Sequence, residues 1–241
     1  MITIPTAELI GGIQDMLPHI LDERSGLAGI VVEWDGSALH FTAYDIYSGA
    51  TVQWVPGEGA EKDDPIETEG SDDGYEPEWG GDDAPWRTWI WLPAVKEIVK
   101  LFKLPAKLWR TPVTIKCTPA GDLIIERTDS PRADRYLRVP GDSDKARRDV
   151  PDVRAIAAKS AANDQPYDNM QFFHARLGAF GAARAHGTLT LFFGAMDEPT
   201  GITMGIRYAG FIYPTGSKNV RRYSFLRDGA GMATYDGEER S

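Results

Sequence analysis

The chain has 241 residues, of which 36 are acidic and 26 are Lys or Arg, so its formal net charge is -10 at neutral pH. This length is enough to bury a substantial core, in one large domain or two ordinary ones. The sequence contains no run of about 18 apolar residues that would span a bilayer, and its start lacks the basic and apolar regions of a signal peptide. We therefore expect a soluble, cytoplasmic protein with no membrane partner. The single cysteine, Cys117, lies in an alternating strand pattern and is expected in the core.

The charge is distributed unevenly along the chain. Residues 1–85 hold 19 acidic residues but only two basic ones, whereas residues 86–241 hold 17 acidic and 24 basic residues. The stretch 57–84 is rich in Asp, Glu, Gly and Pro, so we expect a weakly ordered acidic loop there. Its Ser71–Gly74 cluster lacks the alternating ligand positions of a calcium loop, which favours a solvated loop over a metal site. Two explanations of this uneven charge remain open. Either the basic residues form one face that attracts nucleic acid, or the acidic loop alone accounts for the negative total charge.

The first third of the chain predicts a strand, an amphipathic helix and a meander of strands. Apolar residues recur at the helical period between residues 6 and 20, Thr6 is a candidate N-cap, and Pro18 is expected to bend or end the helix. The alternating strands that follow are joined by the hairpin signal Asp35-Gly36. The expected elements are a strand from Ile2, a helix Thr6–Ile20, and strands Gly29–Trp34, Leu39–Ala43 and Asp45–Val55.

The same order of elements returns in the middle of the chain. A strand Trp86–Leu92 precedes a helix Pro93–Leu104, and strands Val113–Cys117 and Leu123–Glu126 close the unit. Lys96, Lys100 and Lys103 stand at i, i+4 and i+7, so they form one basic stripe along the helix. Such a stripe is usually a solvated face, but it also suits a helix that faces a polyanion.

The last third predicts a third, less complete unit. Residues 139–150 are polar and read as a connector, and Asp152–Ala162 is a short helix candidate. A tail is expected over residues 216–241. The third unit itself comprises Met170–Phe173, a helix His174–Ala185, a strand Thr188–Phe193, a turn Asp197–Gly201 and a strand Ile202–Tyr208.

The residue patterns contain no convincing catalytic site. The four histidines, His19, His40, His174 and His186, lack metal-ligand spacing and a nearby serine motif. The sequence has no phosphate-binding loop, dinucleotide fingerprint or nucleophile elbow. We expect no catalytic residue, cofactor or metal, and an enzyme of unknown chemistry is the weakest of three hypotheses.

The repeated unit resembles the half-domain of the DNA sliding clamp superfamily, which includes the bacterial beta clamp and proliferating cell nuclear antigen. The resemblance covers roughly residues 1–215 and rests on element order and patterning. It implies an α+β fold of duplicated strand-helix-strand-strand units, with helices on one face of antiparallel sheets. The segments that carry it are AELIGGIQDMLPHI with GIVVEWDGSALHFTAYDIYSG, TWIWLPAVKEIVKLFKL with TPVTIKCTPAGDLIIER, and MQFFHARLGAFGAAR with GTLTLFFG and AGFIYPTG.

The resemblance also implies a domain division. Residues 1–138 would form one clamp-like domain that includes the acidic loop 57–84, and 139–150 would be the connector. Residues 151–215 would form a reduced second clamp-like domain, because Asp152–Gln165 is too short for a normal helix and meander. The tail is 216–241.

The function that the resemblance implies is that of a non-enzymatic processivity factor, a homo-oligomeric ring that encircles duplex DNA and tethers a polymerase or other DNA-acting partner. Phosphate contacts would come from the basic helix residues and permit sliding. The alternative is a clamp-fold interaction module or inhibitor that does not encircle DNA, which the acidic first helix favours. The expected DNA-binding residues are Lys96, Lys100, Lys103, Arg154, Lys159, Arg176 and Arg184, and the expected partner-binding residues are Val139, Pro140, Tyr213 and Pro214.

Overall fold

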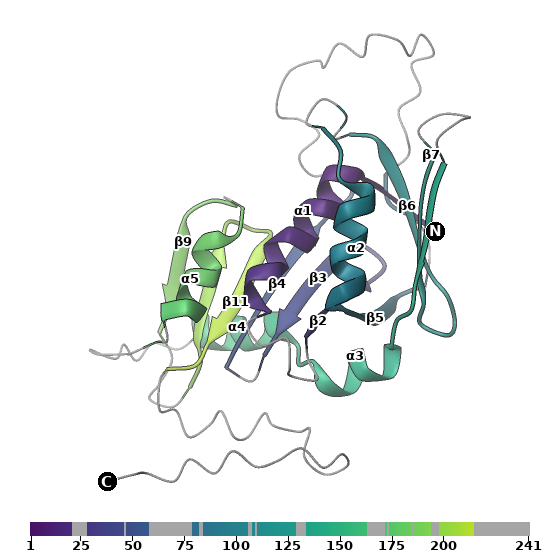
Figure 1. The fold of residues 1–241 in the computed structure, drawn as a ribbon. Coiled ribbons are helices and arrows are strands. Elements are labelled where there is room, and N and C mark those ends of the chain that lie inside the picture. Colours follow the sequence, from purple (N-terminus) through teal and green to yellow (C-terminus); the bar gives the residue numbers. More distant parts are fainter. Residues whose placement is uncertain are drawn as a thin grey trace.

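The structure, a computed structural model, consists of two antiparallel sheets with helices packed against them (Figure 1). It describes residues 1–20, 28–45, 47–57, 79–81, 84–105, 108, 110–128, 134–162, 172, 174–184, 186–193 and 198–214. The helices are α1 (Thr6–Met16), the 3-10 turn η1 (Leu17–His19), α2 (Leu92–Phe102), α3 (Ser143–Asp149), α4 (Val153–Ala161) and α5 (His174–Ala182). The strands are β1 (Ile2–Pro5), β2 (Gly29–Trp34), β3 (Leu39–Tyr44), β4 (Ser48–Trp54), β5 (Trp86–Trp91), β6 (Pro112–Cys117), β7 (Leu123–Thr128), β8 (Asp134–Val139), β9 (Leu189–Phe192), β10 (Thr200–Met204) and β11 (Tyr208–Ile212).

The first two units exchange their opening strands. β1 pairs with β6 of the second unit, with Ile2 opposite Ile115, and β5 pairs with β2 of the first unit, with Trp34 opposite Trp86. The four-stranded sheet therefore has the order β1-β6-β7-β8. Because each unit completes the other's sheet, the two form one body, and the α+β class with antiparallel sheets is confirmed.

The third unit extends the sheet of the first. The seven-stranded sheet has the order β5-β2-β3-β4-β11-β10-β9, and β11 lies antiparallel to β4 from Tyr208 opposite Val52 to Ile212 opposite Ser48. In Figure 1 the sheet runs from β5 beside the four-stranded sheet to β9 at the far edge. A continuous backbone ladder thus connects segments that are about 160 residues apart in the sequence.

The main core lies between the two sheets and the helices α1 and α2, which run side by side in Figure 1. Apolar residues recur at the helical period in α1, so Leu9, Ile13 and Met16 are buried against the sheet. A methyl group on Gly12 would collide with the fully buried ring of Phe41. Gly12 therefore sets how closely α1 approaches β3.

A second apolar cluster covers the opposite face of the seven-stranded sheet. Strand residues alternate between faces, so Val31 and Phe211 point away from α1 and α2. They pack against Val150 and Val153, which belong to the stretch that carries α3 and α4. The helices therefore lie on both faces of this sheet: α1, α2 and α5 on one, α3 and α4 on the other.

Several boundaries differ from the sequence predictions. Thr6 is the first helical residue and not the N-cap, which is Pro5, and the Thr6 hydroxyl donates to the Thr111 carbonyl oxygen at 2.6 Å. The expected strand ending at Tyr208 is two strands, β10 and β11, because Gly205 turns the chain with a positive φ of 58°. β8 and α3 were not predicted as a strand and a helix.

Other predictions concern residues outside the described ranges. These are most of the acidic loop 57–84 with its Ser71–Gly74 cluster, most of the expected strand Met170–Phe173, and the tail 216–241. The division into 1–138, 139–150 and 151–215 stays a prediction. Within the described part of the chain, no helix is long and apolar enough to cross a membrane.

Candidate nucleic-acid interface

The basic stripe of α2 lies on the side of the seven-stranded sheet that α1, α2 and α5 cover, which we call the helical face. Pro93 occupies the first turn, where its missing N–H costs no hydrogen bond. Val95, Ile98 and Phe102 are buried, whereas Lys96, Lys100 and Lys103 are exposed on the other side of the helix. The sequence prediction of one lysine row therefore agrees with the arrangement of α2.

Two arginines from the four-stranded sheet donate hydrogen bonds to the last carbonyl groups of α2. Arg127 is almost completely buried and donates to the carbonyl oxygen of Phe102 at 3.2 Å. Arg135, directly opposite it on β8, donates to the carbonyl oxygen of Leu101. Positive charge is favourable at a helix C-terminus, where the last carbonyl groups have no partner within the helix. Sequence reasoning missed both residues, although their pairing follows from the β7–β8 register.

Acidic side chains engage both of the cations that were expected on the third helix, Arg176 and Arg184. Arg176 forms an ion pair with Asp45 and stacks 4.3 Å from the ring centroid of Tyr47. Arg184, which follows α5, forms an ion pair with Asp15 at 3.0 Å. These two arginines therefore contribute less positive potential to the helical face than their number suggests.

Asp15 is the centre of a buried polar cluster that joins α1 to the third unit. Its carboxylate accepts the backbone N–H of Arg184 at 2.8 Å and the Nε2–H of His186 at 2.7 Å. Burial alone would raise the pKa of Asp15, but the hydrogen bonds from His186 and Arg184 outweigh it and hold the pKa below its usual value. Asp15 is thus expected to stay ionised inside the protein.

His19 lies beside this cluster. Its Nε2 is 2.5 Å from the hydroxyl oxygen of Tyr208, and its ring meets Phe180 edge-on with centroids 4.6 Å apart. Burial lowers the pKa of His19 to about 3, against a weaker opposing effect of the Asp15 charge. The histidines that looked scattered in the sequence therefore include two that pack around Tyr208, since the His186 ring stacks on it.

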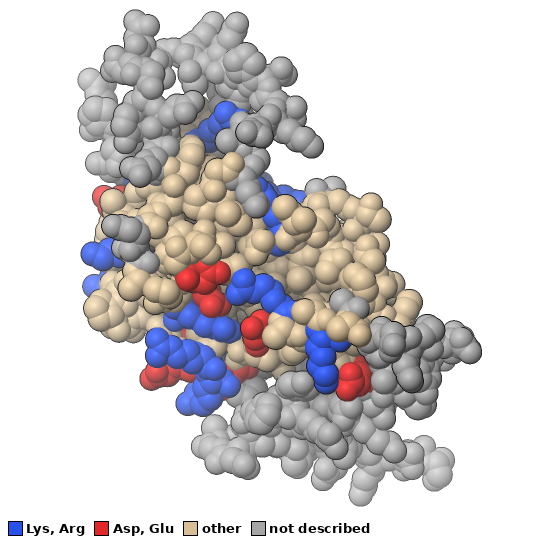
Figure 2. Space-filling model, turned by 180° about the vertical axis from the view of Figure 1, so that it is seen from behind, with Lys and Arg blue, Asp and Glu red and all other residues tan. Residues whose placement is uncertain are grey.

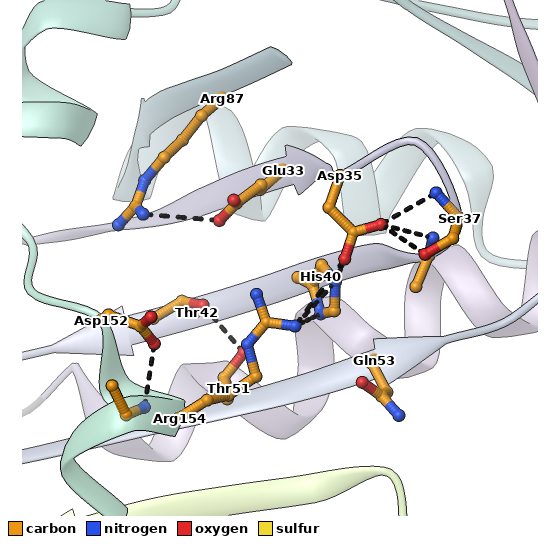
Figure 3. Close-up of polar contacts among 12 residues, drawn as sticks. Glu33, Asp35, Ser37, His40, Thr42, Thr51, Gln53, Arg87, Asp152 and Arg154 are labelled. Atoms are coloured by element: carbon orange, nitrogen blue, oxygen red, sulfur yellow. Dashed lines mark hydrogen bonds and ion pairs between the residues drawn. The ribbon is translucent and has the colours of Figure 1, made fainter. Parts of the chain in front are cut away.

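The two α4 residues lie on the opposite face of the seven-stranded sheet from the α2 lysines. Figure 3 shows Arg154 reaching over the strands toward His40 and Asp35. Its Nη1 lies 3.1 Å from the Nδ1 of His40, whose Nε2 donates to Asp35 at 2.6 Å. Lys159 lies 3.4 Å from Glu198. We expected all seven cations in one interface, but the fold places Arg154 and Lys159 on the opposite face of the sheet from Lys96, Lys100 and Lys103.

The charges on this side are mixed. Figure 2 shows Lys and Arg side chains beside Asp and Glu over the face that α3 and α4 cover. The ion pairs there include Arg87 with Glu33 at 3.4 Å and, on α3, Arg148 with Asp149 at 2.8 Å. A face with alternating charges of both signs attracts a polyanion weakly, because the two signs cancel over a short distance.

The four expected partner-binding residues do not form one exposed surface. Val139 is buried in the main core, and Tyr213 is buried in the second cluster beneath the α3–α4 stretch. Pro140 is exposed and Pro214 is half-buried. A partner peptide therefore cannot reach Val139 or Tyr213 in this conformation.

The fold is similar to that of solved bacterial DNA polymerase III beta subunits and DNA polymerase sliding clamps. The DNA polymerase III beta subunit of Thermotoga maritima matches with a TM-score of 0.57 at 10% identity, over 90% of this chain and 65% of that one. The DNA polymerase sliding clamp of Bacillus subtilis matches with a TM-score of 0.57 at 12% identity, over 88% of this chain and 63% of that one. The sliding clamp of Caulobacter crescentus matches with a TM-score of 0.55 at 13% identity, over 91% of this chain and 67% of that one.

No protein-family model matches the sequence, and no curated protein matches it either. The chain spans just under two thirds of the length of the first of these clamps. At such low identity the likeness is one of fold. The agreement over about nine tenths of the chain, at TM-scores of 0.57, leads to one conclusion: this protein has the fold of the DNA sliding clamps.

Proposed function

We propose that the protein is a DNA sliding clamp, a processivity factor whose copies assemble into a ring around duplex DNA and tether a polymerase or another DNA-acting partner. The observation that carries the proposal is the exposed row of Lys96, Lys100 and Lys103 on the helical face of a clamp fold. Contacts from such a row go to phosphates, so they carry no sequence information and allow the protein to slide.

The two sheets offer edges through which copies can associate. β8 lies at one edge of the four-stranded sheet and β9 at one edge of the seven-stranded sheet. An edge strand presents backbone N–H and C=O groups that can pair with another chain. Pairing β8 of one copy with β9 of the next is a head-to-tail contact, which closes into a ring when the rotation between copies allows it.

The lysine row is tested by duplex binding as a function of salt. Fluorescence anisotropy with a labelled duplex should give a steep dependence of affinity on salt, and replacing Lys96, Lys100 and Lys103 with Ala should reduce the slope by up to about 3, since each phosphate contact contributes about 0.9. The matched control is Arg154→Ala with Lys159→Ala, which removes cations from the other face. An unchanged slope in the triple variant, or an equal reduction in the control, contradicts the assignment.

A second function is favoured by a different set of observations. Glu8 of α1 forms an ion pair with Arg207, and Asp15 and Asp45 engage Arg184 and Arg176. These pairs reduce the positive potential of the face and suit a clamp-fold interaction module or inhibitor that does not encircle DNA. Light scattering on the full chain discriminates the two, because a protein that remains a monomer at working concentration cannot encircle a duplex.

A further inference from the structure

A cavity of about 170 Å³ opens on the helical face between α1, the end of α2 and the segment after α5. Its apolar part is formed by Ala7, Ile10 and Leu104, and its polar part by Gln14, Lys103 and Arg184. The cavity therefore combines two cations with an apolar surface, next to the lysine row of α2. This combination suits a ligand that has both an anionic group and an apolar body.

The Arg184 side chain is held in a defined position. Its Nε and Nη2 lie 3.0 Å from the Oδ2 of the buried carboxylate of Asp15, so this edge of the guanidinium faces inward. A methyl group on Gly11 would collide with the guanidinium, which shows that the group lies directly against α1 at this glycine. The planar guanidinium has five N–H donors, and Asp15 accepts only some of them. The remaining N–H groups can donate to a second oxyanion.

Lys103 supplies the second charge. It is the first residue beyond α2, and the hydrogen bonds from Arg127 and Arg135 to the carbonyl groups of the preceding residues fix the end of the helix. Its side chain is exposed at the cavity. An anion between Lys103 and Arg184 would receive charge-assisted hydrogen bonds from two different segments of the chain.

We propose that this cavity binds one sugar–phosphate unit, with the phosphate between Lys103 and Arg184 and the sugar against Ala7, Ile10 and Leu104. The inference deepens the proposed function and rests on it, since the source that we favour is the backbone of a nucleic-acid strand. It gives one phosphate contact a defined position in the interface, whereas the other phosphate contacts permit sliding. A free sugar phosphate has the same chemistry and is the other source.

The test is the substitution Gly11→Ala, which changes no charge. The three atoms nearest the added methyl group all belong to the Arg184 guanidinium, so the methyl group pushes this group out of its place beside Asp15, and Ala is a better helix former than Gly. Gly181→Ala is the matched control, because a methyl group at that position meets no atom of the described residues within 4 Å. Lys103→Gln removes the second cation from an exposed position, and thermal unfolding shows whether each variant keeps its fold.

We expect Gly11→Ala and Lys103→Gln each to weaken duplex binding severalfold and to reduce its salt slope by about 1, while Gly181→Ala leaves both unchanged. Deoxyribose 5-phosphate, titrated against the labelled protein by NMR, should shift the amide signals of Gly11 and Gln14 in a saturable way. Gly11→Ala should abolish that shift. Inorganic phosphate, which lacks the apolar body, should bind more weakly.

The possible failures are distinguishable. If duplex binding responds to Lys96→Ala with Lys100→Ala but not to Gly11→Ala, the cavity is not a contact site and the proposed function stands. If the wild-type protein binds no duplex yet binds the sugar phosphate, the cavity serves a free ligand and the clamp proposal fails. If neither the duplex nor the sugar phosphate responds to Gly11→Ala, the inference is wrong.

Discussion

The buried imidazole of His19 should make the folded state lose stability as the pH falls below neutral. The pKa of this histidine is about 3 in the folded protein, against about 6.5 in an unfolded chain. Between these two values the unfolded state binds a proton that the folded state does not. Stability from this group is therefore complete above about pH 6.5 and decreases as the pH falls toward 3.

The magnitude follows from the difference in proton binding. One proton corresponds to about 1.4 kcal/mol per pH unit, so His19 should lower the free energy of unfolding by about 2 kcal/mol between pH 7 and pH 5. This is a large share of the roughly 5–15 kcal/mol by which folded proteins are stable. Carboxyl groups such as Asp15, whose pKa is lowered, add their effect only below about pH 4.

Urea unfolding of the wild type and His19→Gln at pH 7, 6 and 5 measures this effect. The amide of Gln can still pair with the Tyr208 hydroxyl but does not titrate, so the variant should show a shallower decline by about 2 kcal/mol over the same range. Burial also lowers the pKa of His40, and this contribution is common to both proteins. If the two stabilities fall in parallel, the folded protein accommodates a charged His19 and the reasoning is refuted.

Two further substitutions probe the fold. Gly12→Ala should destabilise the protein by about 1–3 kcal/mol, measured as a shift in the urea midpoint, because its methyl group would overpack the buried ring of Phe41; a stability equal to that of wild type would show that α1 can move away from β3. Asp152 caps α4 by accepting the N–H of Ala155 at 3.0 Å, so Asp152→Ala should cost about 1 kcal/mol in thermal unfolding, and Asp152→Asn should recover most of it. A loss in Asp152→Asn as large as that in Asp152→Ala would show that the negative charge, and not the cap, is what matters.

The elements that the sequence predicted well are those whose apolar period is strong and local. The β2 strand Gly29–Trp34 has the bounds that its alternation predicted, and α2 begins and ends within two residues of its prediction. The sequence prediction missed β8 and α3 because both are rich in charged residues, which hide any apolar period. In β8, Arg135 donates a hydrogen bond to the Leu101 carbonyl oxygen of α2, and in α3 the one buried residue is Ala146. A polar stretch that packs through a few residues has little apolar period to detect.

The candidate site was predictable only along one helix. The spacing of Lys96, Lys100 and Lys103 fixes their common side once α2 is a helix. Which face of a sheet α4 covers depends on the path of the chain between elements, and the sequence carries no periodic signal for that. The ion pairs of Asp15 and Asp45 join positions more than 130 residues apart, so local reasoning could not have paired them.

The backbone pairing between β4 and β11, with α4 packed against these strands, affects how the proposed ring could open. Five consecutive residue pairs cross this junction, and Val153 of α4 packs against Phe211 beneath them. Bending the molecule here would break backbone hydrogen bonds and expose a buried apolar cluster at the same time. If copies of this chain form a ring, we therefore expect the ring to open at the contact between β8 of one copy and β9 of the next when circular DNA enters. The β4–β11 junction within each copy would then move as a rigid unit.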